Sequence, residues 1–199
     1  MTTAPAISPA HSRYTSVAIG LHWLIAVLAI GQIAGGFYFE GLPKSADAER
    51  FQLIQLHKSF GITILLLTFA RLAWRLGHKP PPLPKAMPGW QKAAARGLHI
   101  GFYVLLIGVP LGGWAIVSAS PLAESVKTYL FGVVPWPHLP FFDGIEDRKG
   151  LAHDIAELHE IGAKLMLGMI VLHAGAAMKH WLLDRDGVLE SMAPFLARK

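Results

Sequence analysis

Four long apolar runs are the feature that most constrains how this chain can fold. They cover residues 16–39, 53–76, 97–117 and 156–183. Each is long enough to cross the roughly 30 Å hydrocarbon core of a bilayer as a helix. Only 16% of the 199 residues are charged and 53% are hydrophobic, whereas about 25% are charged in soluble proteins. The sequence therefore predicts an all-α integral membrane four-helix bundle, with residues 1–199 forming one domain.

Basic residues gather in the connection between the second and third runs, which carries no acid. They are Arg71, Arg75, Lys79, Lys85, Lys92 and Arg96. Because basic loops remain cytoplasmic, this connection and both chain termini are predicted to lie inside, with the protein in the bacterial inner membrane. The same bias explains the formal net charge of +5. The expected partner is the lipid bilayer, and nucleic acid is not expected.

The chain has no cysteine. This excludes disulfides, thiolate nucleophiles, cysteine-ligated iron–sulfur clusters and covalent C-x-x-C-H attachment of haem. Any redox or metal chemistry must therefore depend on histidine.

The fourth run carries His159 and His173, fourteen residues apart. In a helix the two side chains point within about 40° of each other and lie about 21 Å apart along the axis. One imidazole is then near each membrane surface. By depth, His57 belongs with His159 at the outer level, while the inner level offers His173 with either His22 or His99.

Four imidazoles at two depths suit two non-covalent bis-histidine haems of the b type, because bundle interiors accommodate the flat apolar macrocycle. Pairs about 21 Å apart cannot form one tetrahedral zinc site. A proton relay, a transport site or interhelical hydrogen bonding stay open on spacing alone. Glycines within two turns of the histidines would give a macrocycle room, although glycine also promotes helix packing. They are Gly20, Gly61, Gly162, Gly168 and Gly175.

Three segments resemble the bacterial cytochrome b561 family: IGLHWLI around His22, LHKSFGITILLL around His57, and LHEIGAKLMLGMIVLHA around His159 and His173. The similarity extends over nearly the whole chain, in order and in spacing. It implies a four-helix membrane cytochrome with two haems b. It also implies that His22 and His173 ligate the inner haem, and that His57 and His159 ligate the outer one.

The resemblance further implies an oxidoreductase of the respiratory chain that takes electrons from periplasmic superoxide and reduces ubiquinone. An alternative is a cytochrome b subunit that anchors a partner dehydrogenase or hydrogenase and carries its electrons onward. A histidine-gated transporter without haem is a third possibility. The outer connection, Ser118 to Asp154, would be either the docking surface for a periplasmic redox partner or a cap over the outer haem.

An anionic donor would be attracted by cations near the outer level. The candidates for steering superoxide are Lys58, Lys127, Arg148, Lys149 and Lys164. Near the inner level, the side chains that could contact a quinone are His180, Arg71, Trp74 and His99.

Overall fold

The computed structural model describes residues 13–123 and 125–197, and four long helices dominate it. Each contains one of the predicted apolar runs, with the fourth run continuing just past its helix. They are α1 (Ser16–Glu40), α2 (Asp47–Gly77), α3 (Gly89–Ala119) and α4 (Arg148–Lys179). By length and composition all four can cross a membrane, as predicted.

Short elements complete the two ends of the bundle. Between α3 and α4 lie the strands β1 (Thr128–Leu130) and β2 (Val134–Trp136) and the 3-10 turn η1 (Pro140–Phe142). After α4 come a π-helical turn, η2 (His180–Asp184), then α5 (Val188–Met192) and η3 (Pro194–Leu196).

Three helices begin earlier than the apolar runs predicted. The helix α2 starts six residues before its run, with Asp47 and Glu49 in its first turn, where carboxylates favour the positive end of the helix dipole. The helix α4 starts at Arg148, because the Asp147 side chain caps it by accepting a 2.8 Å hydrogen bond from the Gly150 N–H.

The predicted outer loop from Ser118 to Asp154 is therefore too long, since α3 ends at Ala119 and α4 begins at Arg148. The connection is also not a free loop. Its strands β1 and β2 pair antiparallel, and the Phe131 N–H donates to Ser59 Oγ on α2 at 2.9 Å. The indole of Trp114 donates to the Pro137 carbonyl at 2.9 Å. We call residues 120–123 and 125–147 the outer cap.

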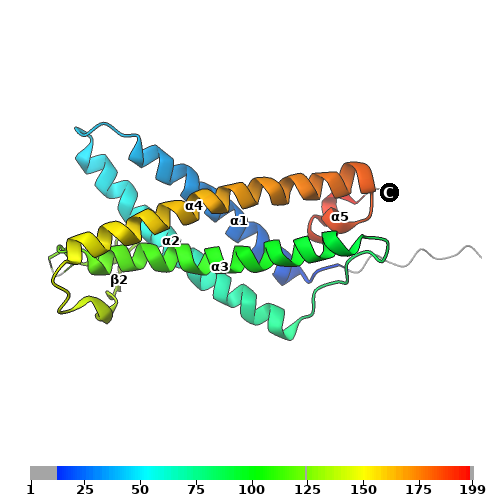
Figure 1. The fold of residues 1–199 in the computed structure, drawn as a ribbon, viewed down its shortest axis with the longest axis horizontal. Coiled ribbons are helices and arrows are strands. Elements are labelled where there is room, and N and C mark those ends of the chain that lie inside the picture. The colour runs from blue at the N-terminus through cyan, green and yellow to red at the C-terminus, as the bar shows by residue number, and fades with distance from the viewer. Residues whose placement is uncertain (1–12, 124, 198–199) are drawn as a thin grey trace, which may run out of the picture.

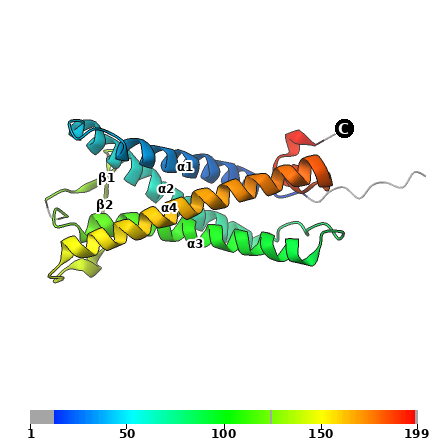
Figure 2. The same ribbon diagram turned by 45° about the horizontal axis from the view of Figure 1, so that its top comes forward.

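The helices form two antiparallel pairs that cross each other (Figure 1). In Figures 1 and 2, α3 and α4 run side by side, and the hairpin of α1 and α2 packs obliquely against them. The outer cap lies at one end of the bundle. The described N-terminal segment, α5 and the proline-rich connection before α3 lie at the opposite end, where the Tyr14 N–H donates to the Ser191 carbonyl at 3.4 Å.

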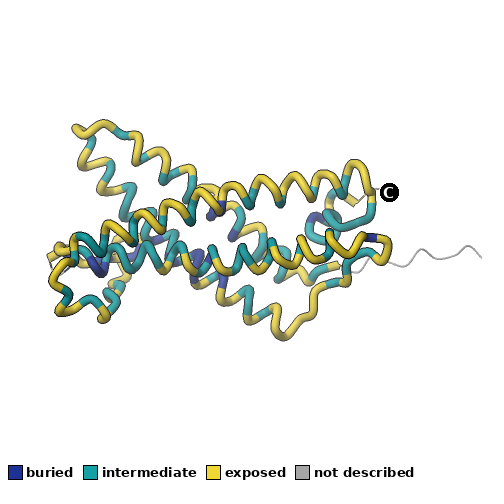
Figure 3. The backbone as a smooth tube through the Cα atoms, viewed as in Figure 1, coloured by how far each residue is buried: buried dark blue, intermediate teal, exposed yellow. Residues whose placement is uncertain are grey.

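The buried core is small and lies at mid-bundle, while most of the helix length is exposed or half-buried (Figure 3). Its members are Ile25, Ala29, Ile64, Leu106 and Met166. Met166 is seven residues from both His159 and His173 on α4, so this core separates the two histidine levels. Large apolar side chains such as Val27, Val104 and Leu172 are more than 60% exposed, as expected for a lipid-facing surface.

Candidate functional site

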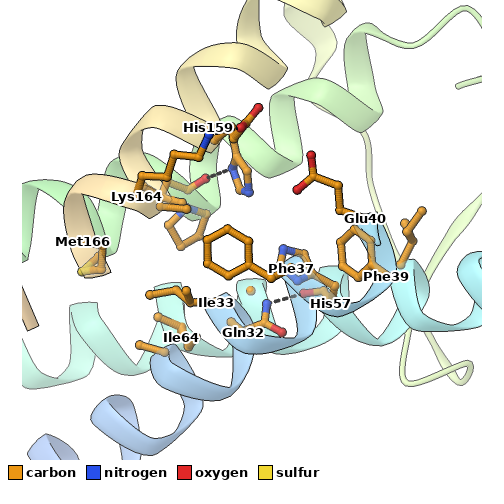
Figure 4. A pocket seen from close by; sticks show the side chains of 18 of the residues that line it. Gln32, Ile33, Phe37, Phe39, Glu40, His57, Ile64, His159, Lys164 and Met166 are labelled. Atoms are coloured by element: carbon orange, nitrogen blue, oxygen red, sulfur yellow. Dashed lines mark hydrogen bonds and ion pairs between the residues drawn. The ribbon is translucent and has the colours of Figure 1, made fainter. Parts of the chain in front are cut away.

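The outer level brings together His57 of α2 and His159 of α4. Their ring centres are 6.1 Å apart and the ring planes make an angle of 69°. Both rings line a cavity of about 450 Å³. In Figure 4, Ile33, Ile64 and Met166 lie toward one end of this cavity, and Phe39 and Glu40 lie toward the other. The two histidines that were assigned to the outer level from the sequence therefore line one largely apolar cavity.

The inner level brings together three histidines. His22 of α1 lies 6.1 Å from His173 of α4, with ring planes at 68°. His99 of α3 lies 5.6 Å from the same ring, with planes at 82°. The His22–His173 geometry therefore repeats that of the outer pair, and the His99 geometry does not.

An iron between two imidazoles requires a definite ring separation. With metal–nitrogen bonds of about 2 Å and ring nitrogens about 1.1 Å from the ring centre, the centres lie roughly 6.3 Å apart. Both 6.1 Å pairs fit this separation. Among the residues that the structure describes, the Nδ1 atoms of His22 and His57 are buried without a hydrogen-bond partner, so the described chain leaves part of these imidazoles unsatisfied. The residues present fit a bis-histidine metal at each level.

The orientation of His159 is set by α3. Its Nδ1 donates to the Val109 carbonyl at 2.8 Å, which leaves Nε2 as the nitrogen available to a metal. A Cβ at Gly113 would lie 3.1 Å from His159 Cε1, and one at Gly112 would lie 3.8 Å from its Nδ1. Gly113 therefore lets the ring lie against α3, whereas a side chain at Gly112 would begin only at ordinary contact distance. Sequence reasoning missed both, although the consecutive glycines after Pro110 were a visible signal.

The glycines singled out from sequence divide into two groups. A Cβ at Gly162 would lie 2.7 Å from Val109 Cγ2, and one at Gly61 would lie 3.5 Å from Gln32 Nε2. At Gly20, Gly168 and Gly175, no described atom would lie within 4 Å of an added Cβ. Gly162 thus permits close packing of α4 on α3, and the last three face open space.

Charges of both signs lie on the outer cavity. Glu40, Arg50, Glu160 and Lys164 line it, and Lys164 forms an ion pair with Glu160. Arg50 donates to the Leu42 carbonyl, while its Nε is buried without a partner. Arg50 was missed from the sequence, although it lies seven residues before His57 and so on the same helix face. Because the signs balance, this cavity has no net formal charge to attract an anion.

The other cationic candidates lie in or next to the outer cap. Arg148 donates to the Ser118 carbonyl at 2.9 Å and so joins the start of α4 to the end of α3. Burial, with added repulsion from the cations Lys58 and Arg148, lowers the pKa of the His138 imidazole. Lys58 is half-buried and Lys149 is exposed, and Lys127 lines a second cavity in the cap together with His138. Lys58 and Arg148 thus both act electrostatically on His138, whereas Lys149 is not among the causes of its pKa shift.

The predicted quinone contacts lie at the inner end but occupy different surroundings. The Nδ1 atom of His180 is 2.7 Å from Asp186 Oδ2 and 3.1 Å from Asp184 Oδ2. Trp74 stacks on His78 at 3.9 Å and donates its indole N–H to Thr15 Oγ1 at 2.9 Å.

The remaining two candidates are Arg71, which lies beside the Tyr103 ring, and His99, whose Nδ1 contacts the Ala95 carbonyl at 2.6 Å. Within residues 13–123 and 125–197, no hydrogen bond or ring contact joins His180 to Arg71 or Trp74.

Comparison with known proteins agrees with this architecture. Residues 13–195 match the family profile described as prokaryotic cytochrome b561. Cytochrome b561 homolog 2 of Escherichia coli K12 is 31% identical over 181 residues, 90% of each chain. Cytochrome b561 homolog 1 of the same strain is 28% identical over 183 residues, 92% of this chain and 98% of the relative.

A third relative is named "Probable superoxide oxidase CybB", from Yersinia pestis. It is 30% identical over 186 residues, 92% of this chain and 97% of the relative. The family match covers all four membrane helices and both histidine levels. The chain therefore belongs to the prokaryotic cytochrome b561 family, whose membrane cytochromes carry haem b.

Proposed function

We propose that His57 and His159 ligate an outer haem b, and that His22 and His173 ligate an inner one. The observation that carries this proposal is the repeated geometry, 6.1 Å between ring centres with planes at 69° and 68°. The His99 ring is 5.6 Å from His173, closer than the roughly 6.3 Å that a bridging iron requires. His99 is then a neighbour of the inner haem and not its ligand.

Haem b with two histidine ligands has no open coordination position, so it supplies reversible one-electron transfer. The protein's own residues hold and shield it. The Val109 carbonyl keeps His159 in one tautomer and orientation. The apolar side chains of the outer cavity exclude water, and the apolar core around Met166 lies between the two levels.

The outer haem would face the periplasm. The connection that carries the cluster of basic residues lies at the end of the bundle opposite the outer cap. By the positive-inside bias this end is cytoplasmic, together with the described chain ends. The two histidine pairs would then hold haems along an electron path from the outer cap to the cytoplasmic side.

The proposed reaction is the oxidation of periplasmic superoxide coupled to the reduction of ubiquinone. Each of two superoxide ions gives up one electron and leaves as dioxygen, while ubiquinone takes up two electrons and two protons to become ubiquinol. The name of the Yersinia pestis relative supports the donor. Lys58 and Arg148, beside the cap, supply positive charge for attracting it, and His180, Trp74 and His99 are the residues proposed to contact the quinone.

A second candidate function is a membrane anchor that passes on the electrons of a partner dehydrogenase or hydrogenase. It is favoured by apolar side chains exposed on the outer cap, where Val133 is 75% and Phe141 77% exposed. Exposed apolar residues of this kind are typical of docking surfaces.

The purified protein tests these functions directly. We expect a b-type band in the reduced-minus-oxidised spectrum, about two haems per chain, and reduction of a soluble ubiquinone analogue when superoxide is generated. Superoxide dismutase should abolish that reduction. A colourless protein would overturn both cytochrome functions. A di-haem protein inert to superoxide that co-purifies with a dehydrogenase would favour the anchor.

Gly113→Val is expected to weaken outer haem binding. The added Cβ would lie 3.1 Å from His159 Cε1, and the valine methyl groups would push the ring away from the cavity. Overpacking of about 1–3 kcal/mol corresponds to roughly 5- to 150-fold weaker retention, measured by transfer of haem to apomyoglobin. The matched control is Gly108→Val on the same helix, where an added Cβ meets no described atom within 4 Å. Equal haem loss in both variants would contradict the role of Gly113.

A further inference from the structure

Arg71 lies at the depth of the inner histidines. It follows His57 on α2 by fourteen residues, the interval that also separates the two histidines of α4. Its side chain is thus within about 40° of His57 around the helix and about 21 Å further along the axis. In agreement, Arg71 lies within electrostatic range of His22, His99 and His173.

The neighbours of Arg71 leave its positive charge uncompensated. Its guanidinium carbon is 6.0 Å from the centre of the Tyr103 ring on α3, and that of Arg75 is 5.8 Å from the same ring. Among residues 13–123 and 125–197, neither guanidinium forms an ion pair with a carboxylate or a hydrogen bond. Arg71 is half-buried whereas Arg75 is exposed, so water can solvate Arg75 more readily.

An unpaired guanidinium inside a membrane span is costly and requires an anion. Haem b carries two propionate carboxylates on one edge of its macrocycle, and His22 and His173 would hold that macrocycle at the depth of Arg71. The forked donors of arginine match a carboxylate in a bidentate pair, which a lysine cannot reproduce.

We infer that Arg71 binds a propionate carboxylate of the inner haem. This inference rests on the proposed ligation by His22 and His173. It gives Arg71 a role toward the cofactor in place of the quinone. A phosphate of a lipid headgroup is the competing anion at this depth.

The test compares haem b with its dimethyl ester, in which both propionates are uncharged. The haem-stripped His57→Ala variant, whose outer site is disabled, is titrated with each compound, and binding at the inner site is followed by absorbance. We expect the ester to bind roughly 10- to 100-fold more weakly than haem b. Adding Arg71→Gln should abolish this difference, and adding Arg71→Lys should preserve part of it.

Arg96→Gln is the matched control, because Arg96 is an exposed cation at the same basic end of the bundle. This variant should keep the full preference for haem b over its ester. Equal binding of haem b and its ester in the His57→Ala parent would overturn the inference and leave lipid phosphate as the anion. A preference that survives Arg71→Gln would also overturn it. If the His57→Ala parent instead took up two haems, the proposed ligation would fail, which is a distinguishable result.

Discussion

Replacing His57 with alanine is expected to remove the outer haem and leave the inner one. Haem content should fall from about two per chain to about one, because the iron loses one of two axial ligands in a cavity whose other linings are mainly apolar. His159→Ala should have the same effect, since it removes the other ligand and its hydrogen bond to the Val109 carbonyl. A pyridine haemochrome assay counts the haems, and the reduced-minus-oxidised spectrum identifies the one retained.

The matched control is His153→Ala. His153 also lies on α4, six residues before His159, but its side chain is 71% exposed and pairs with Glu157 at 3.3 Å. This variant should keep both haems. If His57→Ala or His159→Ala retained two haems with unaltered spectra, the outer ligand pair would be wrong.

His22→Ala is expected to remove the inner haem, whereas His99→Ala should retain both haems. The His22–His173 pair has the ring separation of the outer pair, 6.1 Å, and the His99 ring is closer at 5.6 Å. The effect of His22→Ala should again be the loss of about one haem per chain. For His99→Ala we expect at most a change in the reduction potential of the inner haem. A redox titration followed at the b-type absorbance band measures it.

Each variant is the control for the other, because both remove an imidazole next to His173. Loss of the inner haem in His99→Ala with retention in His22→Ala would reverse the inner assignment. Loss in both would show that the inner site tolerates no change at either residue, and His22→Met, which replaces one axial ligand type by another, would then identify the ligand through its altered spectrum.

The number and order of the membrane helices were predictable from sequence, and their ends were not. Hydropathy marks only the segment that must lie in lipid. The helices α2, α3 and α4 continue beyond their apolar runs at their N-terminal ends. For α4 the cap is Asp147, whose bond to the Gly150 N–H adds a further helical segment before the apolar run. This local effect shortened the outer connection that the sequence predicted as a loop.

The outer cap could not be predicted, because its attachment depends on contacts between distant parts of the chain. The Phe131 N–H donates to Ser59 Oγ, 72 residues earlier, and the Leu139 N–H donates to Ser118 Oγ, 21 residues earlier. Apolar and charge patterns carry no signal for hydrogen bonds of this kind, since each partner is an ordinary polar group until the helices bring it into place.

The sequence by itself determined the membrane class, the four spans and the two depths of histidine, because helix rise and the side-chain period are fixed by backbone geometry. Depth alone could not choose between His22 and His99, since both lie at the inner level and depth says nothing about lateral distance. The preference for His22 came from the resemblance to the cytochrome b561 family. The tertiary structure supplies the lateral distances, in which the ring centres of His22 and His173 have the same 6.1 Å separation as the outer pair. It also placed Gly113 of α3 against His159 of α4, 46 positions later in the sequence. These contacts depend on how helices that are far apart in sequence pack side by side. The fourteen-residue spacing along one helix carries no information about that packing.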